Sequence, residues 1–136
     1  MPSSTTLSDL PRVLVVDDNQ AMLTRVVSVL SHDCDVVGAV SNGPAALDAA
    51  RALRPDVIVL DISMPGMTGL EVASALRQSG STAALVFLTV HDDEEYVQAA
   101  RAAGGIGYVM KPRLVSDLML AVREAQLGRP FVSASR

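Results

Sequence analysis

The 136-residue sequence is poor in aromatic residues and in cysteine. It has no Trp, two Tyr and two Phe, and aromatics make up 3% of the chain. This composition argues against a stacking platform of the kind that binds unpaired bases. Because Cys34 is the single cysteine, the chain forms no internal disulfide, which fits a reducing compartment. Cys34 is expected to be an inert, small apolar residue. One cysteine and two histidines also argue against a structural zinc site.

Long apolar runs, a basic leader and an excess of positive charge are missing as well. No apolar run approaches the length that spans a bilayer, and the polar start of the chain lacks the pattern of a signal peptide. Lys and Arg total 11 against 15 Asp and Glu, a formal net charge of −4. That balance does not favour binding to a polyanion such as DNA. We therefore expect a cytoplasmic domain with no membrane contact and no direct nucleic-acid binding.

Hydrophobic residues are plentiful, at 49% of the chain, and the length suits one domain with one aliphatic core. Short apolar runs alternate with amphipathic stretches of helical period five times. Strands are predicted at 13–16, 36–40, 57–60, 84–88 and 107–110. Helices are predicted after each strand, with apolar faces that include Val26, Ala46, Ala73, Ala100 and Ala121.

This alternation predicts an α/β fold with a parallel five-stranded sheet and helices on both faces. The domain is expected to span residues 12–127. Residues 1–11 are expected to form a flexible leader, and residues 128–136 a C-terminal tail or the start of a linker. Asp92 and Asp93 are expected to cap the fourth helix.

One stretch organises the rest of the chain. Four apolar residues, 57–60, stop at the carboxylate of Asp61, and Pro65 and Gly66 break the chain soon after. Such a run is typical of a strand buried on both faces. Asp61 then lies at the carboxyl end of its strand, where open α/β sheets bind ligands. Taken alone, Asp61 could equally serve to cap the turn.

Other polar residues also follow strands. Asp17 and Asp18 follow the first strand, Thr89 ends the fourth and Lys111 follows the fifth. The sequence does not state the strand order, but the common order 2-1-3-4-5 would bring the three carboxylates onto adjacent strands. Clustered carboxylates require a cation or protons, and oxygen-only ligands favour Mg²⁺. With an ammonium and a hydroxyl nearby, the set is typical of phosphoryl transfer.

Four motifs in this order closely resemble the receiver domain of bacterial two-component response regulators. They are residues 15–19 (VVDDN), 60–66 (LDISMPG), 88–89 (LT) and 108–112 (YVMKP). The resemblance covers about residues 12–127 and implies a flavodoxin-like, CheY-like fold. Residues 91–96 and 128–133 are most similar to the subfamily that usually carries a C-terminal helix-turn-helix, which implies a role in transcription regulation.

The resemblance implies a role for each acidic residue. Asp61 would accept a phosphoryl group from a histidine kinase or a phosphotransfer protein. Asp18 would bind Mg²⁺ directly and Asp17 through water, with Asp61 and the main-chain carbonyl of Ser63 completing the metal site. Mn²⁺ is the alternative ion. Such a domain catalyses only its own phosphotransfer and dephosphorylation and is not an enzyme that acts on metabolites.

The resemblance also implies how the signal leaves the site. Lys111 and Thr89 would bind the phosphoryl oxygens, and Tyr108 would turn inward when Thr89 moves. The output face would be the fourth helix, the last strand and the last helix, roughly residues 93–127. A second copy of the chain is a further partner that the family implies.

Three residues are expected to tune reaction rates. Ser63 and His91 occupy positions that adjust the lifetime of the phosphoryl group in the family, although His91 could also be a plain exposed loop residue. Val90 departs from the family, which often has a smaller residue there. A bulkier side chain could narrow the approach of the phosphodonor or of water.

Other functions remain as alternatives. A stand-alone receiver could act through protein contacts without phosphorylation, and a small Mg²⁺-dependent phosphohydrolase would turn over many substrate molecules. Residues 104–107 (GGIG) precede a strand and lack the GxGxxG spacing, so they do not predict a dinucleotide site. No phosphate loop for flavin follows the first strand, and residues 17–19 do not match the DxD arrangement of haloacid-type phosphatases.

Overall fold

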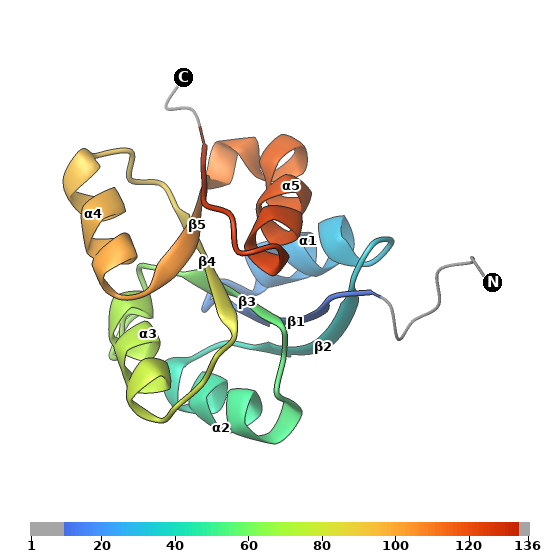
Figure 1. The fold of residues 1–136 in the computed structure, drawn as a ribbon. Helices are drawn as coiled ribbons and strands as arrows, with labels where there is room; N and C mark the ends of the chain where they lie inside the picture. The colour runs from blue at the N-terminus through green and yellow to red at the C-terminus, as the bar shows by residue number, and fades with distance from the viewer. Residues whose placement is uncertain (1–9, 134–136) are drawn as a thin grey trace.

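The computed structural model describes residues 10–133. Most of the expected leader and the last three residues lie outside this part. The described residues form six parallel strands and five α-helices, which alternate along most of the chain (Figure 1). The elements are β1 (Arg12–Val16), α1 (Gln20–Leu30), β2 (Asp35–Val40), α2 (Gly43–Leu53), β3 (Val57–Asp61), α3 (Gly69–Gln78), β4 (Ala84–Thr89), α4 (Glu94–Ala102), β5 (Gly105–Met110), a 3₁₀ turn (Lys111–Arg113), α5 (Leu114–Gln126) and β6 (Phe131–Val132).

The sheet has the order β2-β1-β3-β4-β5-β6, so the predicted order of the first five strands is confirmed. β1 and β3 are neighbours, with Val16 opposite Leu60. The sixth strand was not predicted, since a five-stranded sheet was expected and residues 131 and 132 fall in the stretch expected to form a C-terminal tail or the start of a linker. Phe131 and Val132 pair in parallel with Gly107 and Tyr108 of β5.

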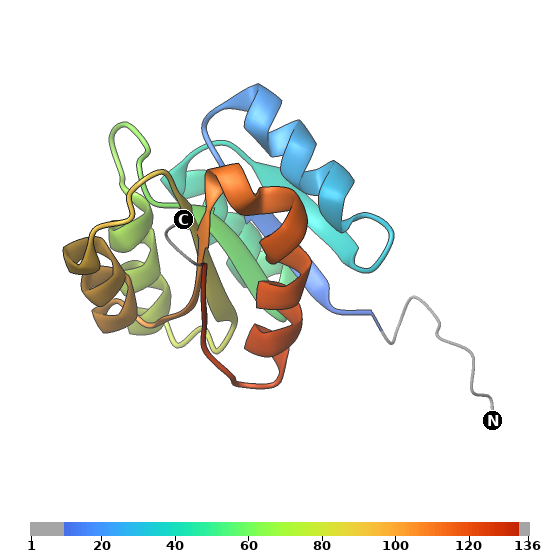
Figure 2. The same ribbon diagram turned by 90° about the horizontal axis from the view of Figure 1, so that it is seen from above.

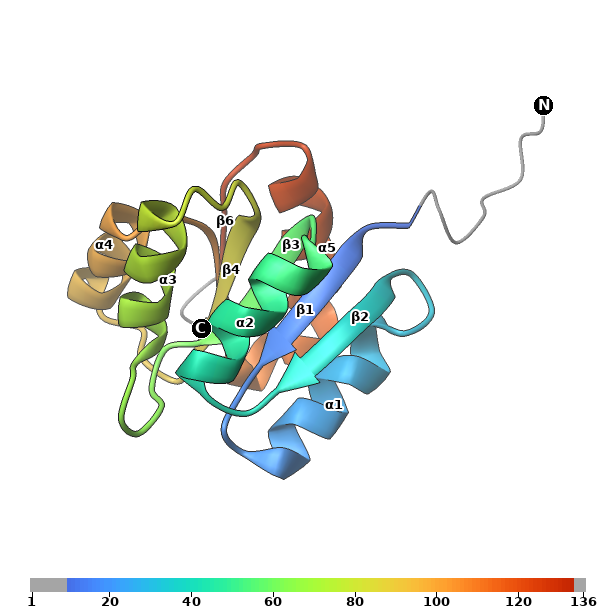
Figure 3. The same cartoon turned by 90° about the horizontal axis from the view of Figure 1, so that it is seen from below.

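The helices cover both faces of the sheet, as predicted. α1 and α5 lie on one face and α2, α3 and α4 on the other (Figures 1 and 2). Each face has its own aliphatic core, one around Val26 and Leu118 and the other around Leu60 and Leu76. β3 lies inside the sheet, between β1 and β4 (Figure 3), and all five of its residues are buried. This double burial explains why its sequence is a continuous apolar run.

Side chains fix most helix starts. Asn19 and Asn42 accept hydrogen bonds from main-chain N–H groups of α1 and α2, and Thr68 forms a reciprocal capping box with Glu71 at α3. The predicted cap of the fourth helix is confirmed in its position but makes no side-chain hydrogen bond. Asp93 occupies the N-cap position of α4, but its side chain accepts no capping hydrogen bond.

Two further features bear on chemistry. Cys34 is buried, its thiol lies 3.6 Å from the sulfur of Met119, and burial raises its pKa to about 11. The thiol is therefore poorly reactive at neutral pH. Among residues 10–133, no helix is long and apolar enough to cross a membrane.

Candidate phosphoryl-transfer site

The carboxyl ends of β1, β3, β4 and β5 place polar side chains at one edge of the sheet. Asp61 is the last residue of β3, Thr89 the last of β4, and Lys111 directly follows β5. Asp17 and Asp18 follow β1. One carboxylate oxygen from each of Asp17, Asp18 and Asp61 lies within 4.8 Å of the others. The order β1-β3-β4-β5 thus brings together residues that lie up to about a hundred positions apart in the sequence.

The three carboxylates differ in their exposure to solvent. Asp17 is 0% exposed and Asp61 2%, whereas Asp18 is exposed. Lys111 Nζ lies 3.2 Å from Asp61 Oδ1 and 3.5 Å from Asp17 Oδ2. One ammonium therefore serves two buried carboxylates. Since three acidic groups face one cation here, the site as it stands carries an excess of negative charge.

The electrostatics of Asp61 reflect this excess. Burial and, to a smaller extent, the neighbouring Asp17 raise the pKa of its carboxyl to about 6, although Lys111 and the Ser63 N–H oppose the shift. A nearby cation would stabilise the ionised form of this carboxyl group. The site is therefore preorganised to bind a positive ion at neutral pH.

A metal ion fits an unsatisfied atom of the site. Asp17 Oδ1 accepts a hydrogen bond of 2.9 Å from the N–H of Asn19, but the buried Oδ2 accepts none from residues 10–133. A buried carboxylate oxygen that accepts no hydrogen bond is costly, even with the Lys111 ammonium 3.5 Å away. Asp17, Asp18 and Asp61 offer oxygen ligands only, so the donor set suits a hard divalent cation that keeps part of its water shell, as Mg²⁺ does.

The loop after β3 shapes the backbone around Asp61. The N–H of Ser63 donates to Asp61 Oδ1 at 3.3 Å, and the N–H of Gly69 donates to the carbonyl of Ile62 at 2.8 Å. A Cβ at Gly69 would overlap the main-chain carbonyl of Asp61. Gly69 is thus a site residue that the sequence reasoning missed. The local sequence does not signal this contact, because the close approach depends on how the loop folds back.

The loop after β4 links the remaining predicted residues. The Thr89 hydroxyl accepts a hydrogen bond of 2.9 Å from the His91 N–H, and the His91 carbonyl accepts one of 2.9 Å from the Tyr108 hydroxyl. The His91 ring stacks on Tyr96, with centroids 4.1 Å apart, and its Nε2 lies 3.4 Å from Ser63 Oγ. Residue 91 is therefore a junction between the loops after β3 and β4.

Tyr108 lies inside the protein and is 3% exposed. Burial raises the pKa of its phenol, so the hydroxyl remains a donor at neutral pH. Among the described residues, no hydrogen bond joins Thr89 to Asp61 or Lys111. The side chain of Val90 is 64% exposed.

The two carboxylate oxygens of Asp61 differ in their contacts. Oδ1 contacts Lys111 and the Ser63 N–H, whereas Oδ2 accepts no hydrogen bond from the part of the chain that the structure describes. A carboxylate with a free oxygen beside a cation pocket can act as a nucleophile. Lys111 is placed to balance charge on a group that becomes attached there.

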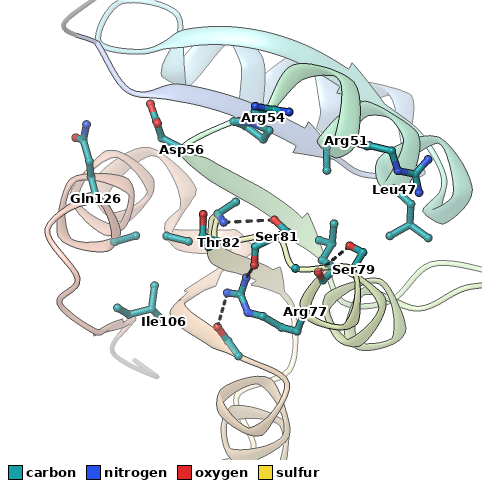
Figure 4. A pocket seen from close by; sticks show the side chains of 18 of the residues that line it. Leu47, Arg51, Arg54, Asp56, Arg77, Ser79, Ser81, Thr82, Ile106 and Gln126 are labelled. Atoms are coloured by element: carbon teal, nitrogen blue, oxygen red, sulfur yellow. Dashed lines mark hydrogen bonds between the residues drawn. The ribbon is translucent and has the colours of Figure 1, made fainter.

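A groove lies at the opposite edge of the sheet, where the strands begin. This groove of about 900 Å³ includes Arg51, Arg54, Arg77 and Asp56 in its lining (Figure 4). Arg77 is engaged within the protein, because its guanidinium donates to the carbonyls of Ser81 and Gly104 at 3.0 and 3.2 Å. The groove is separate from the carboxylate cluster, which lies at the carboxyl ends of the strands.

Comparison with known proteins gives a consistent result. Residues 13–123 match the family described as the response regulator receiver domain. The chain is 37% identical over 123 residues to the nitrate/nitrite response regulator protein NarL of Escherichia coli, covering 89% of this chain and 57% of that protein. It is 35% identical over 126 residues to the probable transcriptional regulatory protein NarL of Mycobacterium tuberculosis, covering 91% and 58%.

Solved structures agree with the fold. The signal receiver domain of the putative response regulator NarL from Mycobacterium tuberculosis superposes with a TM-score of 0.83 at 34% identity, covering 88% of this chain and 98% of that domain. The chain thus spans less than two thirds of the length of the two full relatives, while it matches an isolated receiver almost completely.

Proposed function

This chain belongs to the family of response regulator receiver domains, and from that premise we propose that it accepts a phosphoryl group on Asp61. Receiver domains are signalling modules rather than enzymes that act on metabolites. The observation that carries the proposal is the buried pair of Asp17 and Asp61, with Lys111 Nζ within 3.5 Å of both and no hydrogen bond to Asp17 Oδ2 from the described residues. The proposal is for a cytoplasmic two-component regulator, with a histidine kinase or a phosphotransfer protein as donor.

The chemistry is a displacement at phosphorus. The Oδ2 oxygen of Asp61 forms a bond to the phosphorus of the donor, and the bond from phosphorus to the donor's imidazole nitrogen breaks. The electron pair of that bond stays on the nitrogen, so the product is an acyl phosphate on Asp61. Hydrolysis of the acyl phosphate returns the carboxylate and inorganic phosphate.

The residues around Asp61 divide the remaining tasks. Asp17, Asp18, Asp61 and the carbonyl of Ser63 would hold Mg²⁺ or Mn²⁺, which neutralises charge on the phosphoryl oxygens when bound. Lys111 would form an ion pair with one phosphoryl oxygen. The Thr89 hydroxyl, which accepts the His91 N–H in this structure, would move and donate a hydrogen bond to another phosphoryl oxygen.

Movement of Thr89 would transmit the signal. Because the Thr89 hydroxyl accepts the His91 N–H, and Tyr108 donates to the His91 carbonyl, a shift of Thr89 would alter both contacts. Tyr108 already lies inward while Asp61 carries no phosphoryl group. Phosphorylation would therefore shift an existing equilibrium rather than create a new arrangement. The affected surface would be α4, β5 and α5.

The output of the domain is proposed by analogy. One relative is named as a transcriptional regulatory protein and another as a response regulator. We propose a transcriptional context for this chain, with the output face contacting a second copy or an effector. The formal charge of −4 agrees with a receiver that does not itself bind DNA.

Incubation with acetyl phosphate and Mg²⁺ tests the proposal. Intact-mass spectrometry is expected to show a gain of one phosphoryl group in the unmodified sequence and none in Asp61→Asn. Asp48→Asn, which changes an exposed carboxylate on α2, is a matched control and should gain the group.

The same experiment separates the alternatives. A protein that gains no phosphoryl group at any Mg²⁺ concentration would act through protein contacts alone. Continuous release of phosphate over many turnovers, without a stable adduct, would instead indicate a phosphohydrolase. Either result would contradict the proposed function.

A further inference from the structure

Three hydrogen bonds to two elements hold Ser133, the last residue that the structure describes. It is 7% exposed, although it follows the exposed residues 128–130. Its N–H donates to the Tyr108 carbonyl at 2.9 Å. Its hydroxyl donates to Asp117 Oδ2 at 2.6 Å and accepts from the Met110 N–H at 3.1 Å. Ser133 thus connects the segment after α5 with β5 and with α5 itself.

The hydroxyl of Ser133 replaces a main-chain group of the sheet. If β6 continued as a regular parallel strand, the Met110 N–H would donate to the main-chain carbonyl of Ser133. The side-chain oxygen accepts that N–H instead. The last residue of β5 thus keeps its hydrogen bond, although β6 ends at Val132.

Asp117 holds the other side of the same turn. It is 5% exposed and lies in the first turn of α5. Its Oδ2 also accepts a hydrogen bond of 2.9 Å from Arg113 Nε, and its Oδ1 accepts one of 3.0 Å from the exposed Ser116. Although burial raises its pKa, the hydrogen bonds from Ser133, Arg113 and Ser116 outweigh that effect and lower it, so the carboxylate is ionised.

These contacts enclose the turn that carries Lys111. Met110, directly before Lys111, is held by Ser133, and Arg113, two residues after it, is held by Asp117. Lys111 has a long flexible side chain, and its Nζ must lie between Asp17 and Asp61 to serve both. The place of its main chain therefore determines how often the ammonium is within reach.

We propose that Ser133 and Asp117 are positioning residues for the phosphoryl site. Together they fix the chain on both sides of Lys111 and so hold its ammonium toward Asp61. Residues 131–133 are then a working part of the receiver. This inference rests on the proposed function, because Lys111 is positioned for a phosphoryl group on Asp61.

The test compares two serines that donate to the same carboxylate. In the 136-residue chain, Ser133→Ala is expected to slow phosphorylation by acetyl phosphate and Mg²⁺ about threefold to tenfold, because the turn is loosened. Ser116→Ala removes the exposed hydrogen bond to Asp117 and should leave the rate within about 1.5-fold, as exposed contacts contribute little. Ser133→Thr keeps a hydroxyl and should recover most of the rate.

A double-mutant cycle shows whether the effect passes through Lys111. Once Lys111→Ala has removed the ammonium, Ser133→Ala should slow phosphorylation no further. Amide hydrogen exchange should also become faster at Met110 in Ser133→Ala, while Mg²⁺ affinity changes less than about twofold, because no carboxylate ligand lies on β5. If Ser133→Ala does not fold, Asp117→Asn replaces it in the same cycle.

The outcomes are distinct. An unchanged rate in Ser133→Ala, or an equal further loss in the Lys111→Ala background, would overturn the positioning role and leave the proposed function intact. Absence of any adduct in the unmodified sequence would overturn both.

Discussion

The raised pKa of Asp61 leads to a measurable dependence of Mg²⁺ affinity on pH. Mg²⁺ binds the ionised carboxylate, so a proton on Asp61 competes with the metal. With a pKa of about 6, the group is almost fully ionised at pH 8 and about nine-tenths protonated at pH 5. The apparent Kd for Mg²⁺ should therefore rise about elevenfold between pH 8 and pH 5 through this one proton.

Isothermal titration calorimetry suits this measurement, because the chain has no Trp to report binding by fluorescence. Asp61→Asn should bind Mg²⁺ weakly and without this step in the pH profile. Asp56→Asn, an exposed carboxylate at the amino end of β3, should keep the step. A Kd in the unmodified sequence that is constant from pH 5 to pH 8 would refute the reasoning, since an ordinary aspartate changes affinity by less than about a tenth over that range.

Without metal, the free energy of unfolding should fall as the pH rises, whereas the affinity for Mg²⁺ should increase. Because the folded pKa of Asp61 lies above its ordinary value, the folded state binds the proton more tightly than the unfolded state. The resulting stabilisation is fully present below pH 3.8 and is lost as the pH rises through about 6. The loss is on the order of 3 kcal/mol at most, and urea denaturation with EDTA at pH 4.5 and pH 7.5 would detect it. Added Mg²⁺ should restore stability at the higher pH.

Three substitutions test other parts of the account. Gly69→Ala should lower the free energy of unfolding by about 1–3 kcal/mol in urea denaturation and slow phosphorylation, because the new Cβ meets the Asp61 carbonyl; unchanged values would show that the close approach is unimportant. Thr68→Ala should cost about 1 kcal/mol through loss of the capping box, and a stability within error of the unmodified sequence would contradict that role. Val90→Ala should change the rate of phosphorylation or of dephosphorylation while stability stays within about 0.5 kcal/mol, since the side chain is 64% exposed; identical kinetics would remove the idea that it narrows the approach.

Local sequence patterns were sufficient for the five long strands and the five helices. Continuous apolar runs such as 57–60 end at turn residues, and helical stripes such as those around Ala73 and Ala121 are buried in the structure. The convergence of Asp17, Asp18 and Asp61 also followed once a strand order was assumed. Such patterns predict helices and strands because the spacing of the apolar residues indicates which face of an element is buried.

The features that escaped prediction depend on contacts between distant segments. β6 has only two residues, and its partner is β5, more than twenty positions earlier. Ser133 shows no local sign that its hydroxyl will reach Asp117, and Gly69 shows none that Asp61 will lie against it. Asp93 shows the converse, because a favourable residue type stands at the N-cap position without making the bond. The residue type alone therefore does not determine whether such a contact forms, because the contact also depends on how distant segments pack.

The central claim is that Asp61 is the residue that carries the phosphoryl group. The most direct measurement reduces the phosphorylated protein with borohydride, which converts an aspartyl phosphate to homoserine, and locates the changed residue by peptide mass spectrometry. The account predicts homoserine at position 61, formed only when Mg²⁺ accompanies the donor. Reduction at another aspartate, or at none, would contradict it.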